Sequence, residues 1–119
     1  MDASEKERMD TSRMFFAEDL QANTDWMAKV ISTLSDDVYV TVDLDVFDPA
    51  VMPSTGTPEP GGLGWYQMMQ ALAGVIRGRR VVGFDVVELA PVAGLHAPDY
   101  TVARLIYNFF GMISRNSDL

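Results

Sequence analysis

Two segments with strong β-forming character, joined by one amphipathic helical pattern, most constrain what this chain of 119 residues can fold into. Residues 38–43 alternate valine with more polar residues, which predicts a strand with one aliphatic face. Residues 80–91, RVVGFDVVELAP, form a nearly continuous apolar run, the pattern of a strand covered on both faces. Between them, the apolar residues of 65–76 fall on one stripe of a helix that Gly78 is expected to close. This order predicts a right-handed crossover between parallel strands.

Helical patterns flank this unit on both sides. Apolar residues keep helical spacing over residues 26–34, with Asn23 or Thr24 as the expected N-cap. They do so again over residues 102–112, with Asp99 as the expected N-cap. The order helix, strand, helix, strand and helix is typical of an α/β fold with three layers, α/β/α, around a parallel sheet.

The amino-terminal part of the chain carries weaker signals. Ser4 followed three residues later by Glu7 predicts a capping box that opens a short helix. The segment RMFFAEDL, residues 13–20, predicts an edge strand. The first ten residues lack the apolar core of a signal peptide, and no run approaches the roughly 18 apolar residues of a membrane helix. We therefore expect a cytoplasmic protein that has no membrane partner.

The charge balance narrows the class of ligand. The formal net charge is −8, whereas a nucleic-acid-binding protein presents a basic face to the phosphates. A cationic small molecule or a metal ion suits this chain better, so we expect no nucleic acid. The chain has no cysteine, which excludes disulfides and thiolate metal sites and fits a reducing compartment.

Three carboxylates are expected at one edge of the sheet. In open α/β sheets ligands bind beyond the carboxyl ends of the strands, and Asp43 and Asp45 close the first strand while Glu88 closes the second. Aspartates at positions i and i+2 of a strand point the same way, with their Cα atoms roughly 6 to 7 Å apart. Both are ionised at low cost only when a cation lies near them, and Mn²⁺ or Mg²⁺ prefers such oxygen ligands. The alternative is that the carboxylates cap a loop.

Two other motifs share this aspartate spacing. A calcium-binding EF-hand loop requires Gly at its sixth position and Glu at its twelfth, where this chain has Asp48 and Ser54, so the EF-hand is excluded. A haloacid-dehalogenase-type phosphatase usually has Thr or Val where Phe47 stands, and it carries a later paired-aspartate loop that this sequence lacks. The phosphatase remains an alternative of lower rank.

The same residues resemble a known family. The segment VTVDLDVFDPAVMPSTGTPEPGGL, residues 40–63, is similar to the signature of the ureohydrolases, the arginase and agmatinase family. The segment VVGFDVVELAP, residues 81–91, resembles the one that follows in that family at a similar distance. SRMFFAEDL and LIYNFFG also match, so the resemblance extends over most of the chain and is closest to agmatinases.

The resemblance implies a role for each carboxylate. It makes Asp43 and Asp45 ligands of a centre of two Mn²⁺ ions, with Asp43 bridging them. It makes Glu88 the catalytic and substrate-binding carboxylate, in agreement with the fork of hydrogen bonds that a planar guanidinium donates. Thr57 is expected to line the loop over the substrate, and Asp48 to be a structural hydrogen-bonding residue rather than a ligand.

Two further residues are open to two interpretations. Asp85 either supports the metal ligands from behind or is a buried strand residue bonded to neighbouring backbone. His96, the single histidine, lies in the loop AGLHAPDY without a paired ligand nearby, so we interpret it as a solvated loop residue rather than a proton shuttle.

The implied reaction is hydrolysis of a guanidino compound, first among them agmatine, to putrescine and urea, a step of polyamine biosynthesis. Ureohydrolases also carry GGDHS-like and DAHxD-like segments with further metal ligands, and this sequence contains neither. The resemblance therefore implies that residues 1–119 are the carboxyl-terminal portion of a single catalytic domain, inactive and weakly metal-binding in isolation. We expect it to form homo-oligomers or to need the amino-terminal half. The alternative function is that of a non-catalytic remnant or subunit-interaction module.

Overall fold

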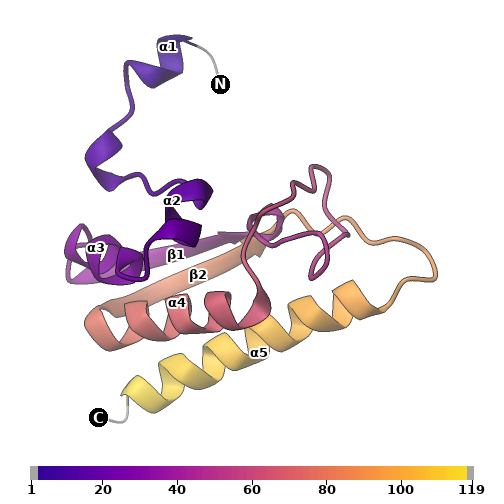
Figure 1. Ribbon diagram of the computed structural model, residues 1–119. Helices are drawn as coiled ribbons and strands as arrows, with labels where there is room; N and C mark the ends of the chain where they lie inside the picture. Colours follow the sequence, from indigo (N-terminus) through magenta and orange to yellow (C-terminus); the bar gives the residue numbers. More distant parts are fainter. Residues whose placement is uncertain (1–2, 118–119) are drawn as a thin grey trace.

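The structure, a computed structural model, describes residues 3–117 (Figure 1). The predicted order of helix, strand, helix, strand and helix is confirmed for residues 26–117, and shorter helices precede it. The elements are α1 (Ala3–Lys6), η1 (Thr11–Arg13), α2 (Ala17–Ala22), α3 (Trp26–Ser32), β1 (Asp37–Asp43), η2 (Leu44–Val46), α4 (Trp65–Gly78), β2 (Arg80–Val87) and α5 (Ala97–Ser117).

Strands β1 and β2 form a parallel pair, as the sequence predicts. The register runs from Asp37 opposite Arg80 to Asp43 opposite Val87, so both strands end at the same edge. A register shift follows Val38, where Val82 is the extra residue of a bulge. Each strand also has one edge that pairs with no other strand of residues 3–117.

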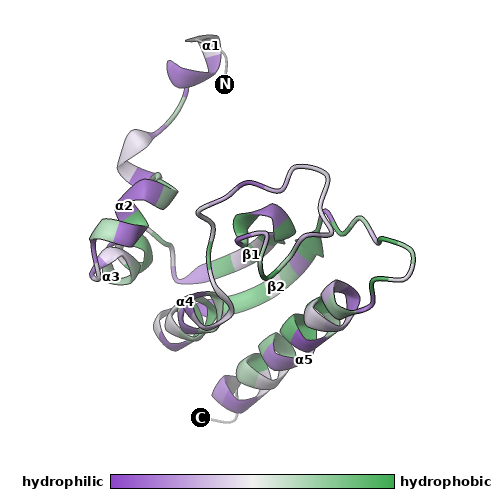
Figure 2. Cartoon of the chain, turned by 45° about the vertical axis from the view of Figure 1, so that its right-hand side comes forward, coloured by the Kyte–Doolittle hydropathy of each residue, from purple (hydrophilic) through white to green (hydrophobic). Residues whose placement is uncertain are grey.

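Helices α4 and α5 cover one face of this pair and enclose the core (Figure 1). Strand β2 is mostly hydrophobic along its length, whereas β1 alternates between hydrophobic and more polar residues (Figure 2). Val42 lies in the core, and Val40 packs against it. The Phe84 and Phe109 rings meet with their centroids 4.4 Å apart, joining β2 to α5. Helix α3 packs against α4 through Ile31, which approaches Gly74 and Gly78 because neither has a side chain to obstruct it. The buried core residues are Val42, Leu44, Phe47, Met52, Leu63, Met68, Leu72, Ile76, Val102, Leu105 and Phe109.

The opposite face of the strand pair is exposed within the described part of the chain. Tyr39 is 60% exposed and Val82 is 59% exposed, and no residue of β2 is fully buried. The prediction that β2 is covered on both faces is therefore wrong for residues 3–117. The reason is that a parallel sheet needs a helical layer on each face, and α4 and α5 lie on the same one.

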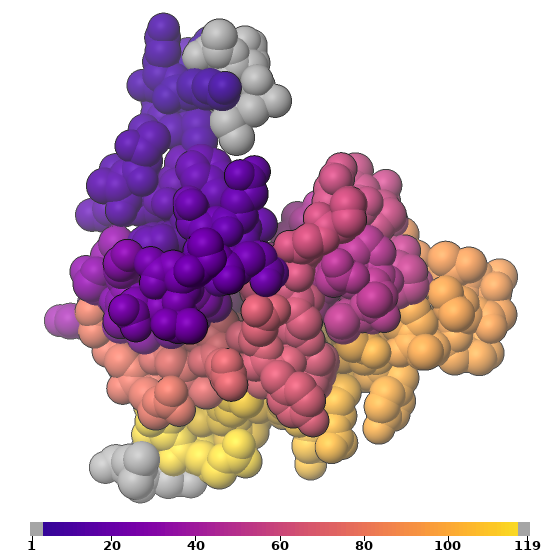
Figure 3. Space-filling model, in the orientation of Figure 1, coloured from indigo at the N-terminus to yellow at the C-terminus, as the bar shows by residue number. Residues whose placement is uncertain are grey.

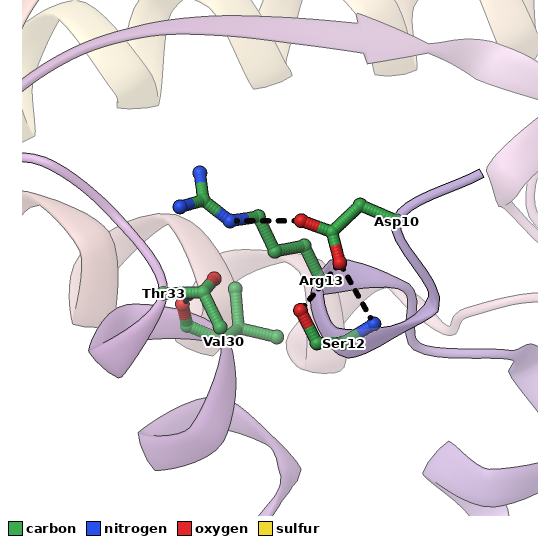
Figure 4. Close-up of polar contacts among 5 residues, drawn as sticks. All are labelled: Asp10, Ser12, Arg13, Val30 and Thr33. Carbon is green, nitrogen blue, oxygen red and sulfur yellow. Dashed lines mark hydrogen bonds and ion pairs between the residues drawn. The ribbon is translucent and has the colours of Figure 1, made fainter. Parts of the chain in front are cut away.

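The predicted edge strand at residues 13–20 is also wrong. Residues 11–13 form η1 and residues 17–22 form α2, because the run AEDLQA consists mostly of good helix formers. Asp10 caps η1 by accepting hydrogen bonds from the backbone and side chain of Ser12, and it forms an ion pair with Arg13 at 3.4 Å (Figure 4). The hydrogen bonds from Ser12 lower the pKa of the Asp10 carboxyl below its usual range.

The amino-terminal caps differ from those expected. Ser4 lies within α1 rather than before it. The N-cap of α3 is Asp25, whose N–H donates to the side chain of Asn23 at 2.9 Å. Helix α5 begins at residue 97, so Asp99 lies in its first turn.

The start of the sheet is fixed by two arginines. Gly78 is the last residue of α4, and the C-cap is Arg79, whose guanidinium donates to the carbonyl oxygens of Ile31 and Leu34 at the end of α3. Arg80 donates two hydrogen bonds to Asp37, at 2.7 and 2.6 Å, and the pair lowers the pKa of that carboxyl. Within residues 3–117 no helix has the length and hydropathy needed to cross a membrane.

Candidate functional site

The chain turns immediately where β1 ends. Asp43 is the last residue of the strand and the N-cap of η2, because its Oδ1 accepts the backbone N–H of Asp45 at 3.1 Å. The expectation that both aspartates share one strand face is therefore wrong. A short aspartate side chain competes with the sheet for backbone donors and favours a turn. Leu44, fully buried between the two aspartates, fixes this turn to the core.

Asp48 closes the loop of residues 48–63. Its Oδ1 accepts the N–H of Ala50 at 2.9 Å, and its Oδ2 accepts the N–H of Gly61 at 3.1 Å. The backbone adds two bonds, from Asp48 N to Leu63 O at 3.0 Å and from Leu63 N to Val46 O at 2.8 Å. The two ends of the loop are thus held together beside the end of β1.

Gly62 is required where these loop ends cross. A Cβ atom at this position would lie 2.5 Å from the carbonyl carbon of Phe47 and 2.6 Å from the backbone nitrogen of Asp48. We expect Gly62→Ala to lower the free energy of unfolding by about 2–3 kcal/mol, since backbone atoms cannot move aside as a side chain can. Urea denaturation followed by circular dichroism measures this change. Gly56→Ala is the matched control, because nothing lies within 4 Å of its Cβ, and equal stability of the two variants would contradict the prediction.

Asp45 is held from the same loop. The hydroxyl of Thr57 donates to Asp45 Oδ2 at 3.0 Å, which fixes one carboxylate oxygen. Ser54 and Thr55 precede Thr57 and are buried, and within the described chain their hydroxyl oxygens have no hydrogen-bond partner. The carbonyl oxygen of Ser54 accepts the N–H of Ala90 at 2.8 Å, so the loop also contacts the segment that follows β2.

Glu88 is the first residue after β2 and has a φ of 71°. It is the one non-glycine residue of the described chain in the left-handed region, which costs a residue with a Cβ roughly 1–2 kcal/mol. Because Asp43 pairs with Val87, Glu88 follows directly at the edge that carries Asp43 and Asp45. Such strain persists where neighbouring contacts fix the conformation, and it concentrates at functional sites.

The remaining predicted residues lie away from this edge. Asp85 lies within β2 and accepts hydrogen bonds from the hydroxyls of Tyr39, at 3.1 Å, and Thr41, on the exposed sheet face. The bond to Asp85 raises the pKa of the Tyr39 phenol. Its partners are thus side chains rather than the backbone groups considered from the sequence. His96 is exposed, and its carbonyl oxygen accepts the N–H of Tyr100 in the first turn of α5.

Two of these carboxylates are of a chemical type that suits a metal ion. Asp43 and Asp45 offer the hard oxygen donors that Mn²⁺ and Mg²⁺ prefer. However, over residues 3–117 no group of three or more His, Cys, Asp or Glu side chains is arranged to hold a metal ion. The three carboxylates of Asp43, Asp45 and Glu88 therefore share a sheet edge, as expected, but they do not form one metal-binding group. The carboxylates of Asp43 and Asp45 suit a divalent ion in type, but two side chains are too few to complete its coordination.

Comparisons with known proteins show the family of this chain and how much of its relatives the chain spans. The model of the Arginase family matches residues 1–111. The N(1)-aminopropylagmatine ureohydrolase of Synechocystis is 38% identical over 99 residues, covering 82% of this chain and 32% of that protein. The agmatinase of Pyrococcus horikoshii is 39% identical over 93 residues, covering 78% of this chain and 33% of that protein. The chain thus spans about a third of the length of these curated relatives.

Solved structures confirm the fold class. The proclavaminate amidino hydrolase of Streptomyces clavuligerus superposes with a TM-score of 0.74 at 30% identity, over 84% of this chain and 35% of that one. The agmatine ureohydrolase of Thermoplasma volcanium gives a TM-score of 0.71 at 28% identity, over 86% and 34% of the two chains. With the family match over most of its length, the resemblance seen in the DxDxxDP and TGTPEPGG motifs is confirmed: this chain belongs to the arginase family.

Proposed function

We propose that this chain is the part of an arginase-type hydrolase that supplies two metal-binding carboxylates and the carboxylate that binds the guanidinium. The observation that carries this proposal is the register of the parallel pair in a member of the arginase family. It brings Asp43, Asp45 and Glu88 to one sheet edge, where ligands bind in α/β folds.

The reaction we propose is hydrolysis of agmatine. The bond between the guanidino carbon and the chain nitrogen breaks, one water is consumed, that nitrogen takes a proton, and urea and putrescine leave. Glu88 accepts a fork of hydrogen bonds from the guanidinium and so orients its carbon. Thr57 holds Asp45 in place through a hydrogen bond of 3.0 Å. A pair of divalent cations, when bound, supplies Lewis-acid activation of water.

Agmatine is favoured by the names of two relatives. One is an agmatinase and the other an N(1)-aminopropylagmatine ureohydrolase, so both names contain the agmatine group. A planar guanidinium cation also suits a chain of net charge −8. We therefore propose agmatine as the substrate. The oxygen donors of Asp43 and Asp45 suit Mn²⁺, which we propose as the metal ion. The lack of cysteine fits a reducing compartment, and we propose a cytoplasmic location.

A second candidate function follows from the incomplete ligand set. Because no group of three potential ligands occurs in residues 3–117, the chain is alternatively a non-catalytic module that keeps the fold and joins related subunits. Its exposed sheet face and the unpaired edges of β1 and β2 suit either an amino-terminal half or further copies of the chain.

The test compares the chain alone with the chain in a mixture. The second component is the part of the Pyrococcus horikoshii agmatinase that this chain does not match. Mn²⁺ binding is measured by calorimetry, and urea release is assayed with agmatine and with N(1)-aminopropylagmatine. We expect tight Mn²⁺ binding, and urea from agmatine, in the mixture alone. Urea from aminopropylagmatine only would change the substrate, and a mixture that binds Mn²⁺ no better than its components would favour the non-catalytic module.

A further inference from the structure

We propose that residues 54–57 form a strap that sets the position of Glu88 relative to Asp45, so that Thr57 and the backbone of Ser54 are positioning groups for the site. This inference rests on the proposed function for its catalytic meaning. The strap itself is a link between the end of β1 and the segment after β2. The evidence for this link is the pair of hydrogen bonds at its two ends.

The first end of the strap holds the Glu88 segment. The carbonyl oxygen of Ser54 accepts the N–H of Ala90, two residues beyond Glu88, at 2.8 Å. Ser54 is 1% exposed, whereas every residue from 88 to 96 is exposed. Since the segment after β2 buries little of its own surface, this backbone bond to the buried residue Ser54 contributes to its order next to the strained φ of Glu88.

The second end of the strap holds the metal-binding side. Thr57 donates its hydroxyl to Asp45 Oδ2 at 3.0 Å. Four residues span at most about 14 Å even when fully extended, so the two anchored groups are confined to one neighbourhood. Figure 3 shows the loop that contains the strap, in magenta, beside the segment after β2, in orange.

The first two residues of the strap are buried, whereas Gly56 and Thr57 are exposed. Thr55 is 8% exposed, and its hydroxyl has no partner within the described chain, as is the case for Ser54. The Ser54 side chain therefore takes no part in the link, which depends on the backbone carbonyl. Ser54→Ala consequently leaves the link intact, while Thr57→Val removes one anchor with little change of shape.

The test is amide hydrogen exchange at Ala90, measured by NMR on the 119-residue chain. We expect Thr57→Val to raise the exchange rate of the Ala90 amide about tenfold, because hydrogen bonds to charged groups are among the stronger ones and the strap opens locally when one anchor is lost. Thr57→Ser restores the hydroxyl and is expected to return the rate to that of wild type, and Ser54→Ala is expected to leave it unchanged. An unchanged rate in Thr57→Val would overturn the proposal.

A second measurement tests positioning in the mixture that releases urea. Ala90→Pro removes the N–H that Ser54 accepts, and Ala90→Ser keeps it. We expect Ala90→Pro to raise KM for agmatine about tenfold with an unchanged affinity for Mn²⁺, because Glu88 is displaced while Asp45 keeps its bond to Thr57. Equal KM values for the two variants would count against the strap. If the wild-type mixture releases no urea, the proposed function fails, and the exchange rates at Ala90 still decide whether the strap exists.

Discussion

Replacing Asp43 by asparagine is expected to lower the affinity of the assembled site for Mn²⁺ by about a hundredfold or more. Groups that merely support a metal ligand change metal affinity by roughly 10- to 100-fold, so removing the charge of a ligand itself has a larger effect. Asparagine keeps the oxygen that accepts the N–H of Asp45 at 3.1 Å. The turn after β1 is therefore preserved, and the loss reports on the carboxylate, that is, on its charge and its second donor oxygen.

Calorimetry on the mixture of this chain with the complementary part of an agmatinase measures the effect. Asp36→Asn is the matched control. Asp36 directly precedes β1, at the opposite end of the strand from Asp43, and its substitution removes the same unit of charge from the chain. We expect Asp36→Asn to bind Mn²⁺ as wild type does. Equal weakening in both variants would mean that net charge, rather than ligation by Asp43, governs binding.

The largest expected effect on stability is that of Phe109→Ala. Phe109 is 0% exposed in the core between α5 and the sheet, and its ring contacts that of Phe84 with a centroid distance of 4.4 Å. Removing a buried phenylalanine ring costs about 3–5 kcal/mol, a large share of the roughly 5–15 kcal/mol that hold a domain folded. We therefore expect the variant to keep its fold with a much lower free energy of unfolding, and thus a lower midpoint of urea denaturation.

Urea denaturation followed by circular dichroism measures this loss, and Tyr107→Ala supplies the control. Tyr107 lies two residues earlier on α5 and is 73% exposed, so its removal is expected to change stability by no more than about 0.5 kcal/mol. A Phe109→Ala variant as stable as Tyr107→Ala would show that α5 does not anchor the sheet.

The central elements could be predicted from the sequence because their signals are periodic. Alternating valines define β1, and the apolar stripes over residues 65–76 and 102–112 define α4 and α5. The segment 13–20 contains the aromatic pair Phe15 and Phe16, which favours a strand. The helix propensity of AEDLQA, residues 17–22, outweighs that preference in the structure.

The site was predictable only in its residue types. The sequence motif predicts which carboxylates are present and that they share one sheet edge. It does not predict the turn at Asp45, where the backbone N–H of Asp45 donates to the side chain of Asp43. The hydrogen bond between Ala90 and Ser54 joins residues that lie far apart in the sequence, and the positive φ of Glu88 occurs at a residue type that seldom adopts it. No periodicity or local propensity encodes such a contact, so it becomes visible only in the folded chain.

The exposed face of β1 and β2 restricts the kind of protein layer that can cover it. Asp85 lies on this face with its two oxygens engaged by Tyr39 and Thr41, both hydroxyls of its own chain. A purely apolar layer placed there would remove the carboxylate from water without repaying its hydration, at a cost of several kcal/mol. A layer that brings an arginine, a lysine or further hydrogen-bond donors avoids this cost. A single aspartate thus makes this exposed sheet face favour a covering layer that carries positive charge or hydrogen-bond donors.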